Sequence, residues 1–236
     1  MNDPYLLLWL EAPLQAWGHD SKFGRRDSLD FPTKSGVLGL LCCARGAAGE
    51  QAEWLQRWAE LDMQVQAYVP VDRQSNAIPP LPLLRDFHMV GSGYDDKDPW
   101  ASLMIPKTSE GKKAVGGGAK MTYRYYLQDM AFAVALQSPK SELDSAAEAL
   151  KNPVWDLYLG RKNCVPTEFI LQGVHDSAAE AMARAGQLGE EKQRRAAFHV
   201  LQGEHDGEVL TLNDVPMQFG GQKKYRDRRV TVVKME

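Results

Sequence analysis

The order of apolar segments constrains the fold of this chain more than any other feature. Tyr5 to Leu10 is apolar on both faces and predicts a central strand, and Met63 to Val69 alternates like a half-buried strand, with helical segments between them. After a long irregular stretch, Ala131 to Gln137 predicts another strand, a helix opens after Pro139, and Glu168 to Gln172 predicts a fourth strand. The order is strand, helix, strand, insertion, strand, helix, strand.

This order predicts an α+β fold with the ferredoxin-like arrangement that the RNA recognition motif shares. We expect residues 1–173 to form one ferredoxin-like domain with an inserted projection at about 91–121. We expect residues 174–236 to form an accessory helix and a β-rich part docked on that domain.

The insertion is irregular and rich in glycine. Leu84 to Val90 and Thr122 to Leu127 predict strands on either side of it, while Asp95 to Lys120 has little periodicity and contains the triplet Gly116 to Gly118. A loop of this length inside a compact domain is usually functional or disordered. Because it also carries apolar residues such as Trp100, we predict a projecting finger that orders against a partner.

The last third predicts one helix and several strands. Ser177 to Glu180 fits a capping box, but Gly186 and Gly189 make the continuation of this helix doubtful. Phe198 to Gln202 and Val209 to Leu212 flank a glycine-containing turn and predict a hairpin.

The first helix begins in a basic, capped segment that favours an anion. Thr33 and Ser35 provide a cap signal, and Arg25, Arg26 and Lys34 surround the predicted helix start, where free amides and the helix dipole favour a phosphate. Gly36 would allow close approach to the backbone. The segment is not a P-loop, because the preceding glycine pattern is absent. An ordinary capped and packed helix with solvated arginines remains the alternative.

Composition and charge narrow the class of protein. The chain has 236 residues, 44% of them apolar, which is enough for a substantial core. Its net charge of -3 argues against a uniformly basic nucleic-acid binder. The charges are sorted along the chain, however, with basic groups near residues 25–34, 107–124, 161–162 and 223–229. One basic face for a polyanion fits this pattern, and so does ordinary solvated surface.

No apolar run is long enough to span a bilayer, and the start Met-Asn-Asp-Pro lacks the basic residues of a signal peptide, so we expect a cytoplasmic protein. The three cysteines, with Cys42 and Cys43 adjacent, form neither a disulfide framework nor a C-x-x-C metal pair. Metal-ligand spacings such as H-x-x-x-H are missing as well. We therefore expect no metal and no cofactor.

Three motifs together resemble a known family. They are Leu10-Glu-Ala-Pro-Leu-Gln-Ala-Trp-Gly18, Phe31-Pro-Thr-Lys-Ser-Gly-Val-Leu-Gly-Leu-Leu41, and Tyr158-Leu-Gly-Arg-Lys-Asn-Cys164 followed by Pro166. They resemble the CasD family, the subunit of the type I-E CRISPR Cascade complex that holds the 5′ handle of the guide RNA. The resemblance implies a ferredoxin-like (RRM-like, RAMP) domain with a protruding thumb. It also implies non-catalytic binding, with guide RNA, the Cascade backbone subunit, the large subunit and target DNA as partners.

The resemblance and the chemistry of the residues together predict an RNA site. A handle phosphate would sit at the start of the first helix, Gln15 and Trp17 would offer an amide and a ring to an unstacked base, and thumb lysines would contact the RNA backbone. Packing or solvated roles are the alternatives for these residues. The predicted RNA-binding residues are Gln15, Trp17, Arg25, Arg26, Lys34, Ser35, Gly36, Lys107, Lys112, Lys113, Tyr158, Leu159, Gly160, Arg161 and Lys162.

Two rival functions stay open at this point. Relatives in type I-C systems cut the guide precursor, and metal-independent cleavage needs a base and a cation in close array. The five histidines are scattered, and His88 is the best candidate base, although a strand histidine is more often structural. A protein-binding module, for which RNA is incidental, is the other rival.

Overall fold

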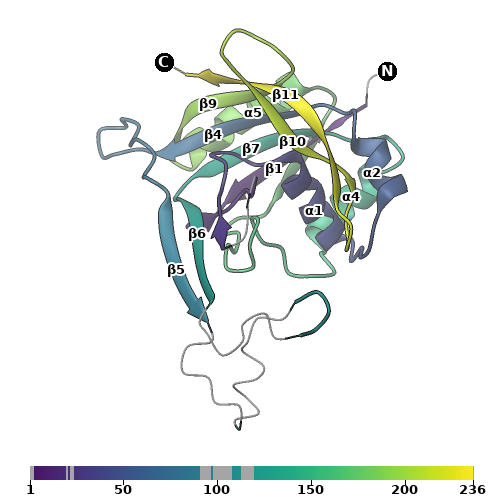
Figure 1. Cartoon of the computed structure of the whole chain (residues 1–236). Coiled ribbons are helices and arrows are strands. Elements are labelled where there is room, and N and C mark those ends of the chain that lie inside the picture. The colour runs from purple at the N-terminus through teal and green to yellow at the C-terminus, as the bar shows by residue number, and fades with distance from the viewer. Residues whose placement is uncertain are drawn as a thin grey trace.

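The structure, a computed structural model, describes residues 3–19, 21, 24–90, 97, 108–112 and 120–235. Its centre is a seven-stranded sheet of order β10-β11-β9-β4-β7-β1-β8, in which every neighbouring pair is antiparallel (Figure 1). The strands are β1 Tyr5–Glu11, β4 Met63–Pro70, β7 Ala131–Gln137, β8 Leu171–His175, β9 Arg194–Gln202, β10 Glu208–Gln218 and β11 Lys224–Lys234.

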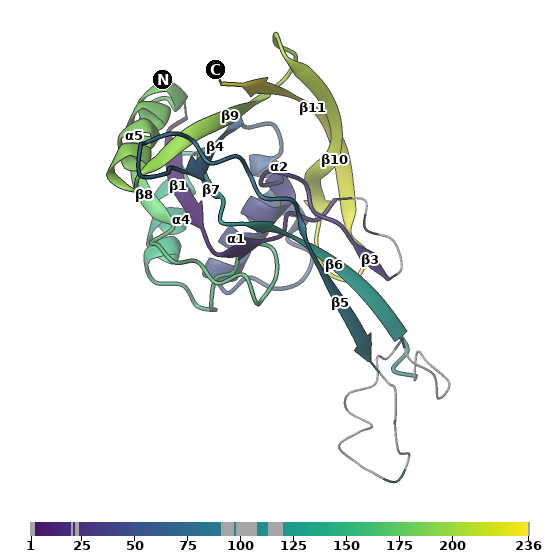
Figure 2. The ribbon, with the colours of Figure 1, turned by 90° about the vertical axis from the view of Figure 1, so that its left-hand side faces the viewer.

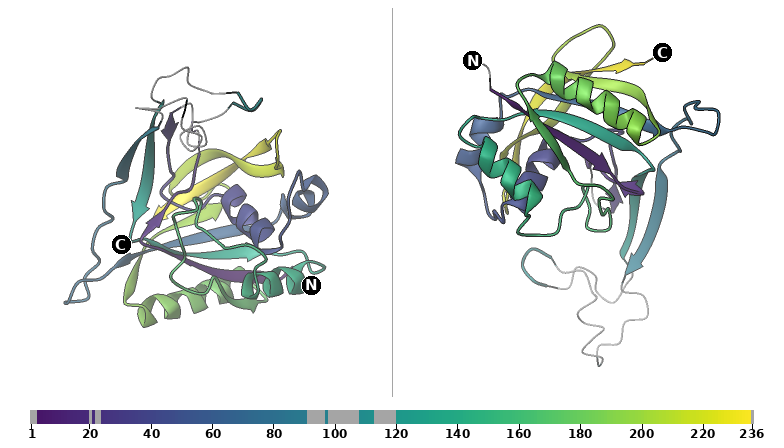
Figure 3. Two further views of the ribbon diagram at one scale, coloured as in Figure 1. Left: turned by 90° about the horizontal axis from the view of Figure 1, so that it is seen from below. Right: turned by 180° about the vertical axis from the view of Figure 1, so that it is seen from behind.

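Helices cover both faces of this sheet. Helices α1 (Lys34–Ala44), α2 (Ala52–Trp58) and α4 (Leu143–Lys151) pack on one face with the even-numbered leucines of β1. Helix α5 (Ala178–Glu191) packs on the other face, where the odd-numbered residues of β1 and the small alanines of β7 lie beneath it (Figure 3). Successive side chains of a strand point to opposite faces, so β1 is buried on both sides. The prediction of a central strand is confirmed.

A second, smaller sheet extends from the body. Strands β5 (Leu84–Val90) and β6 (Lys120–Gln128) form an antiparallel ribbon, which reaches away from the main sheet (Figure 2). Two short strands, β2 (Leu14–Gln15) and β3 (Arg25–Arg26), pair with β6 nearer the body. Both strands predicted beside the insertion are confirmed. The finger itself, at 95–120, lies mostly outside the described residues.

Two expectations for the last third are wrong. The predicted hairpin between Phe198 to Gln202 and Val209 to Leu212 does not form, because β11 lies between β9 and β10 and pairs with both. Helix α5 begins at its predicted cap, with Ser177 accepting from the N–H of Glu180, but it runs through both glycines to Glu191. A Cβ at Gly189 would lie 2.5 Å from the ring of Tyr68, so glycine lets the helix pack against the sheet here.

The remaining differences concern boundaries. The fourth predicted strand, Glu168 to Gln172, begins three residues later, as β8 at Leu171. The region after residue 173 continues the same sheet, since β9 pairs with β4 in the middle of it. The division of the chain at residue 173 stays a prediction. Among the described residues, no helix is long and apolar enough to cross a membrane.

Candidate nucleic-acid interface

The loop of residues 158–164 is held tightly against the start of the chain. Gly160 has a φ of +88°, and a Cβ there would lie 1.6 Å from the carbonyl oxygen of Ala16, so only glycine fits. The N–H of Ala16 donates to the carbonyl of Leu159 at 3.2 Å, and the side chain of Leu159 is buried. The space beside Gly160 is therefore occupied by the protein's own backbone.

This loop positions Arg161 beside β6. Its Nη1 donates to the carbonyl of Tyr125 at 3.0 Å and its Nη2 to the carbonyl of Arg26 at 2.8 Å. Its Cζ lies 4.6 Å from the ring centroid of Tyr126, which is a cation–π distance. Arg161 thus joins the loop to two strands of the smaller sheet, while its side chain is only partly buried.

A cavity of about 580 Å³ opens where the loop faces the β5–β6 ribbon. We call it the basic groove, because four cationic side chains and one carboxylate line it among the described residues. Two tyrosines and a histidine complete the charged and aromatic part of its wall. These lining residues are Arg26, Arg124, Arg161, Lys162, Tyr126, Tyr158, His88 and Asp86.

The basic groove combines the features that single-stranded nucleic acid needs. Its cations can neutralise phosphates, and the half-buried Tyr158 offers a ring beside them, whereas the ring of Tyr126 is buried. The single carboxylate, Asp86, bonds to Nε2 of His88, which lies two residues along β5. Positive charge therefore dominates the groove, and a polyanion fits it better than a cationic ligand.

Five predicted residues meet in this groove: Arg26, Tyr158, Gly160, Arg161 and Lys162. Arg124 and Tyr126 were missing from the predicted site. Alternation along β6 could have indicated them, because side chains two residues apart share one face of a strand. The face that bears Arg124 and Tyr126 also carries Asp86 of the neighbouring strand, which lies opposite Arg124.

The N-terminus of α1 binds an anion, but that anion is part of the protein. Thr33 caps the helix by accepting from the N–H of Gly36 at 3.1 Å, as its sequence signal predicts. The first amide of the helix, the N–H of Lys34, donates to the carboxylate of Asp214 at 2.8 Å. Arg228 holds the same carboxylate through Nε at 2.7 Å and Nη2 at 2.9 Å. Asp214 therefore occupies the position that we predicted for a phosphate.

The side chain of Lys34 points into the protein. It is fully buried, and its Nζ donates to the carbonyls of Ala59 at 2.9 Å and Leu61 at 2.5 Å. Burial lowers the pKa of Lys34 to about 8, and the nearby Arg228 acts in the same direction. The structure thus corrects the prediction for Lys34, which joins α1 to the end of α2 rather than facing RNA.

Gln15 and Trp17 are also internal. The amide of Gln15 donates to the carbonyls of Leu10 and Met130, and its oxygen accepts from the indole N–H of Trp17 at 3.2 Å. Both side chains are buried, so neither presents an amide or a ring to a base. A Cβ at Gly36 would lie 2.8 Å from the ring of Trp17. This glycine makes room for the tryptophan, which corrects its predicted role at a phosphate.

The other predicted residues are spread over the surface. Arg25 is exposed and pairs with Asp27, Ser35 is half-buried at the start of α1, and Lys112 is exposed and pairs with Glu110. Lys107 and Lys113 lie outside the described residues. RNA contact by these residues stays a prediction.

Within the part of the chain that the structure describes, no group of three or more His, Cys, Asp or Glu side chains is arranged to hold a metal ion. Of the histidines, His88 is the one that lines the basic groove. All three cysteines are free thiols.

Comparison with known proteins identifies the family. The sequence pattern of the family described as CRISPR-associated protein (Cas_Cas5) matches residues 5–231 of the chain. The chain belongs to this family. The resemblance that the three motifs indicated is thus confirmed.

Individual relatives agree with this assignment. The chain is 27% identical over 232 residues to the CRISPR system Cascade subunit CasD of Escherichia coli (strain K12), and the match covers 94% of each chain. It is similar to a chain of a solved CRISPR RNA-guided surveillance complex, with a TM-score of 0.71, 29% identity, and coverage of 98% of this chain and 90% of that one. A second solved structure, described as a Cas protein, has a TM-score of 0.61 and 25% identity, with coverage of 98% and 94%.

Proposed function

We propose that this chain is a non-catalytic subunit of a CRISPR Cascade surveillance complex that binds and caps the 5′ handle of the guide RNA. The observation that carries the proposal is the basic groove, where four cations and two tyrosines converge from three separate segments of the chain. Its relatives include a Cascade subunit and a chain of an RNA-guided complex. The family and the groove therefore point to the same ligand.

The fold supports this role. The strand order β8-β1-β7-β4, with α1 and α2 before β4 and α4 before β8, fits a ferredoxin-like core of the RRM type. In this proposal the β5–β6 ribbon is the base of the thumb, which separates handle from spacer. The complex then presents the spacer to target DNA, while other faces of the chain contact the backbone and large subunits.

Binding without cleavage is the proposed task. His88 bonds to Asp86 and lines the groove together with arginines, which bind phosphates but do not act as general bases at neutral pH. We expect guide RNA to stay intact when it is incubated with the purified protein. Cleavage at one defined position, lost in His88→Ala, would contradict the non-catalytic assignment.

The decisive experiment measures the affinity of the protein for a synthetic handle RNA as a function of salt. Replacing Arg26 and Lys162 with alanine should weaken binding. It should also lower the salt slope by about 0.7 for each phosphate of the single strand that the protein no longer neutralises. Both side chains are exposed, so the variant should fold normally.

Lys234→Ala is the matched control. Lys234 is exposed near the C-terminus of β11, which Figure 1 shows at the opposite end of the molecule from the β5–β6 ribbon. This variant should bind like the wild type. Equal salt slopes for the groove variant and the wild type would rule out the basic groove as the RNA site.

A further inference from the structure

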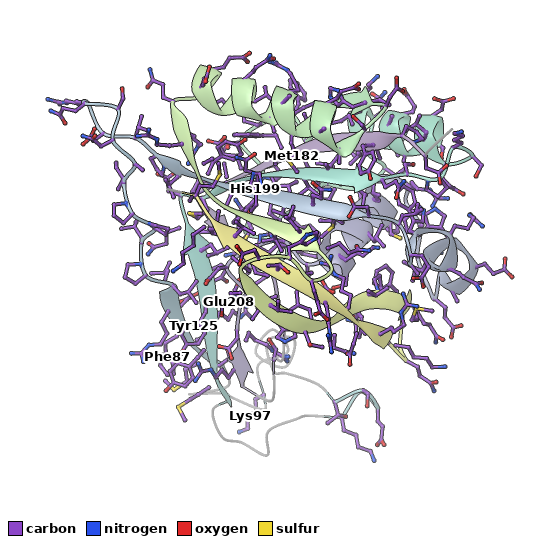
Figure 4. All side chains as sticks on the ribbon, turned by 90° about the horizontal axis from the view of Figure 1, so that it is seen from above. Phe87, Lys97, Tyr125, Met182, His199 and Glu208 are labelled. Carbon is purple, nitrogen blue, oxygen red and sulfur yellow. The ribbon has the colours of Figure 1, made fainter. Side chains whose placement is uncertain are left out.

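The β5–β6 ribbon has a second face, which carries large apolar side chains. The register places Met89 opposite Met121, Phe87 opposite Tyr123 and Arg85 opposite Tyr125, so these side chains share one face. Figure 4 shows the labelled Phe87 and Tyr125 on the two neighbouring strands. We call this surface the aromatic face, and it consists of Arg85, Phe87, Met89, Met121, Tyr123 and Tyr125.

The aromatic face is unusually exposed for its composition. Phe87 is 50% exposed, Met89 54%, Met121 56% and Tyr123 39%, although the four lie side by side. The rings of Phe87 and Tyr123 are 5.3 Å apart and tilted by 39°. Contiguous apolar surface of this kind marks a binding site more often than a free surface.

Cations on this face indicate the kind of ligand. The guanidinium of Arg85 lies 5.9 Å from the ring of Tyr123, and that of Arg25, in β3, lies 5.0 Å from the ring of Tyr125. Arg25 also forms an ion pair with the carboxylate of Asp27. Aromatic rings beside arginines fit a ligand that has flat rings and negative charge, which describes single-stranded nucleic acid.

The two faces of the ribbon belong to the same pair of strands. Arg124 and His88 line the basic groove, while their neighbours Tyr123 and Phe87 lie on the aromatic face. A single-stranded RNA whose phosphates lie in the groove has only to pass the edge of β5. Among the described β-strands, β5 pairs with β6 alone. The unstacked bases of the RNA then reach the rings.

We propose that the aromatic face is a second RNA subsite, on which nucleobases stack against Phe87 and Tyr123 without being read for sequence. This inference rests on the proposed guide-binding function. The groove supplies charge and the aromatic face supplies stacking, so the two contributions differ in their dependence on salt and on the presence of a base.

The test compares two RNA probes with the full-length chain. One probe is a decamer of oligoadenylate, and the other is a decamer with the same backbone but no bases. Phe87→Ala should weaken binding of oligoadenylate by roughly 5- to 150-fold, which corresponds to the loss of one stacked base. It should leave binding of the abasic decamer and the salt slope unchanged, because no cation is removed.

Two further variants distinguish stacking from simple apolar packing. Phe87→Trp should retain affinity for oligoadenylate, whereas Phe87→Leu should lose it, because leucine is apolar but has no ring. Val209→Ala is the control for loss of exposed apolar surface, since Val209 is 44% exposed on β10, outside the ribbon and the basic groove, and the affinity of this variant should equal that of the wild type.

The outcomes separate this inference from the proposed function. If the wild type binds neither probe, the guide-binding proposal fails. If the wild type binds both probes but Phe87→Ala binds oligoadenylate normally, the basic groove remains the proposed RNA site and the aromatic face is not a stacking site. If Phe87→Leu retains full affinity, an aromatic ring is not needed at this position, and the inference that bases stack there is overturned.

Discussion

Replacing Asp214 with alanine is expected to be one of the most destabilising single changes in this protein. Asp214 is 2% exposed and accepts hydrogen bonds from the N–H of Lys34 and from two nitrogens of Arg228. The side chain of Arg228 is itself 7% exposed. Removing the carboxylate leaves a buried guanidinium without its counter-charge and a helix amide without its acceptor.

The size of the effect follows from this burial. Breaking a buried ion pair from one side costs about 3–5 kcal/mol, which for a chain of this length corresponds to a drop in Tm of about 6–20 °C. Urea unfolding followed by circular dichroism measures the free energy directly. The double variant Asp214→Ala/Arg228→Met should recover at least about 1 kcal/mol relative to Asp214→Ala alone, because the unpaired charge is gone.

A control and a refuting result complete this experiment. Glu204 pairs with Arg229 where both side chains are more than half exposed, so Glu204→Ala should hardly change the Tm. If Asp214→Ala costs no more than Glu204→Ala, the carboxylate does not hold α1 in place. If the double variant loses the sum of both single effects, the two side chains are not coupled.

Three further outcomes are expected. Burial lowers the pKa of Lys34 in the folded protein from 10.5 to about 8. Between pH 8 and pH 10.5 the unfolded chain therefore holds the Lys34 proton more often than the folded protein does. The contribution of Lys34 to the free energy of unfolding should rise with pH across this range. The free energy of unfolding of the wild type, measured against Lys34→Met, should therefore increase from pH 8 to pH 10, and a flat difference would contradict the burial of a charged ammonium. Gly160→Ala should destabilise the protein by at least about 2 kcal/mol and weaken handle binding, since its Cβ would collide with the carbonyl of Ala16; a normal Tm would refute this. Gly186→Ala, in α5 with no atom beyond the helix's own backbone and its chain neighbours within 4 Å of the new Cβ, should instead stabilise the protein by about 0.5–1 kcal/mol, and a loss of stability would contradict the open space around this position.

Local patterns in the sequence predicted local structure well. The strands at β1, β4, β5, β6 and β7 and the Thr33 and Ser177 caps depend on alternation and capping within a few residues, and the structure confirms them. The hairpin in the last third failed because adjacency along the chain was taken for pairing. Nothing within residues 194–218 shows that β11 inserts between β9 and β10.

Site residues were harder to predict because a polar group can either bind a ligand or form hydrogen bonds within the protein. The positive end of α1 does favour an anion, but the partner comes from 180 residues away in the sequence. Gln15 has the chemistry to contact a base, yet its amide donates to the main-chain carbonyls of Leu10 in β1 and of Met130 just before β7. Arg161 and Lys162 lie in a loop outside the core, and they line the basic groove together with Arg26 of β3.

The position of β11 has a consequence for how the chain folds during synthesis. Until residues 224–234 leave the ribosome, β10 has no partner strand in the described sheet and β9 has a neighbour on one side only. Asp214 on unpaired β10 then has no fixed position from which to reach the N–H of Lys34. Contacts between such distant residues form slowly. A nascent chain therefore lacks this contact at the start of α1 until β11 arrives, so translation that stops before β11 yields a protein whose α1 lacks its ion-paired carboxylate.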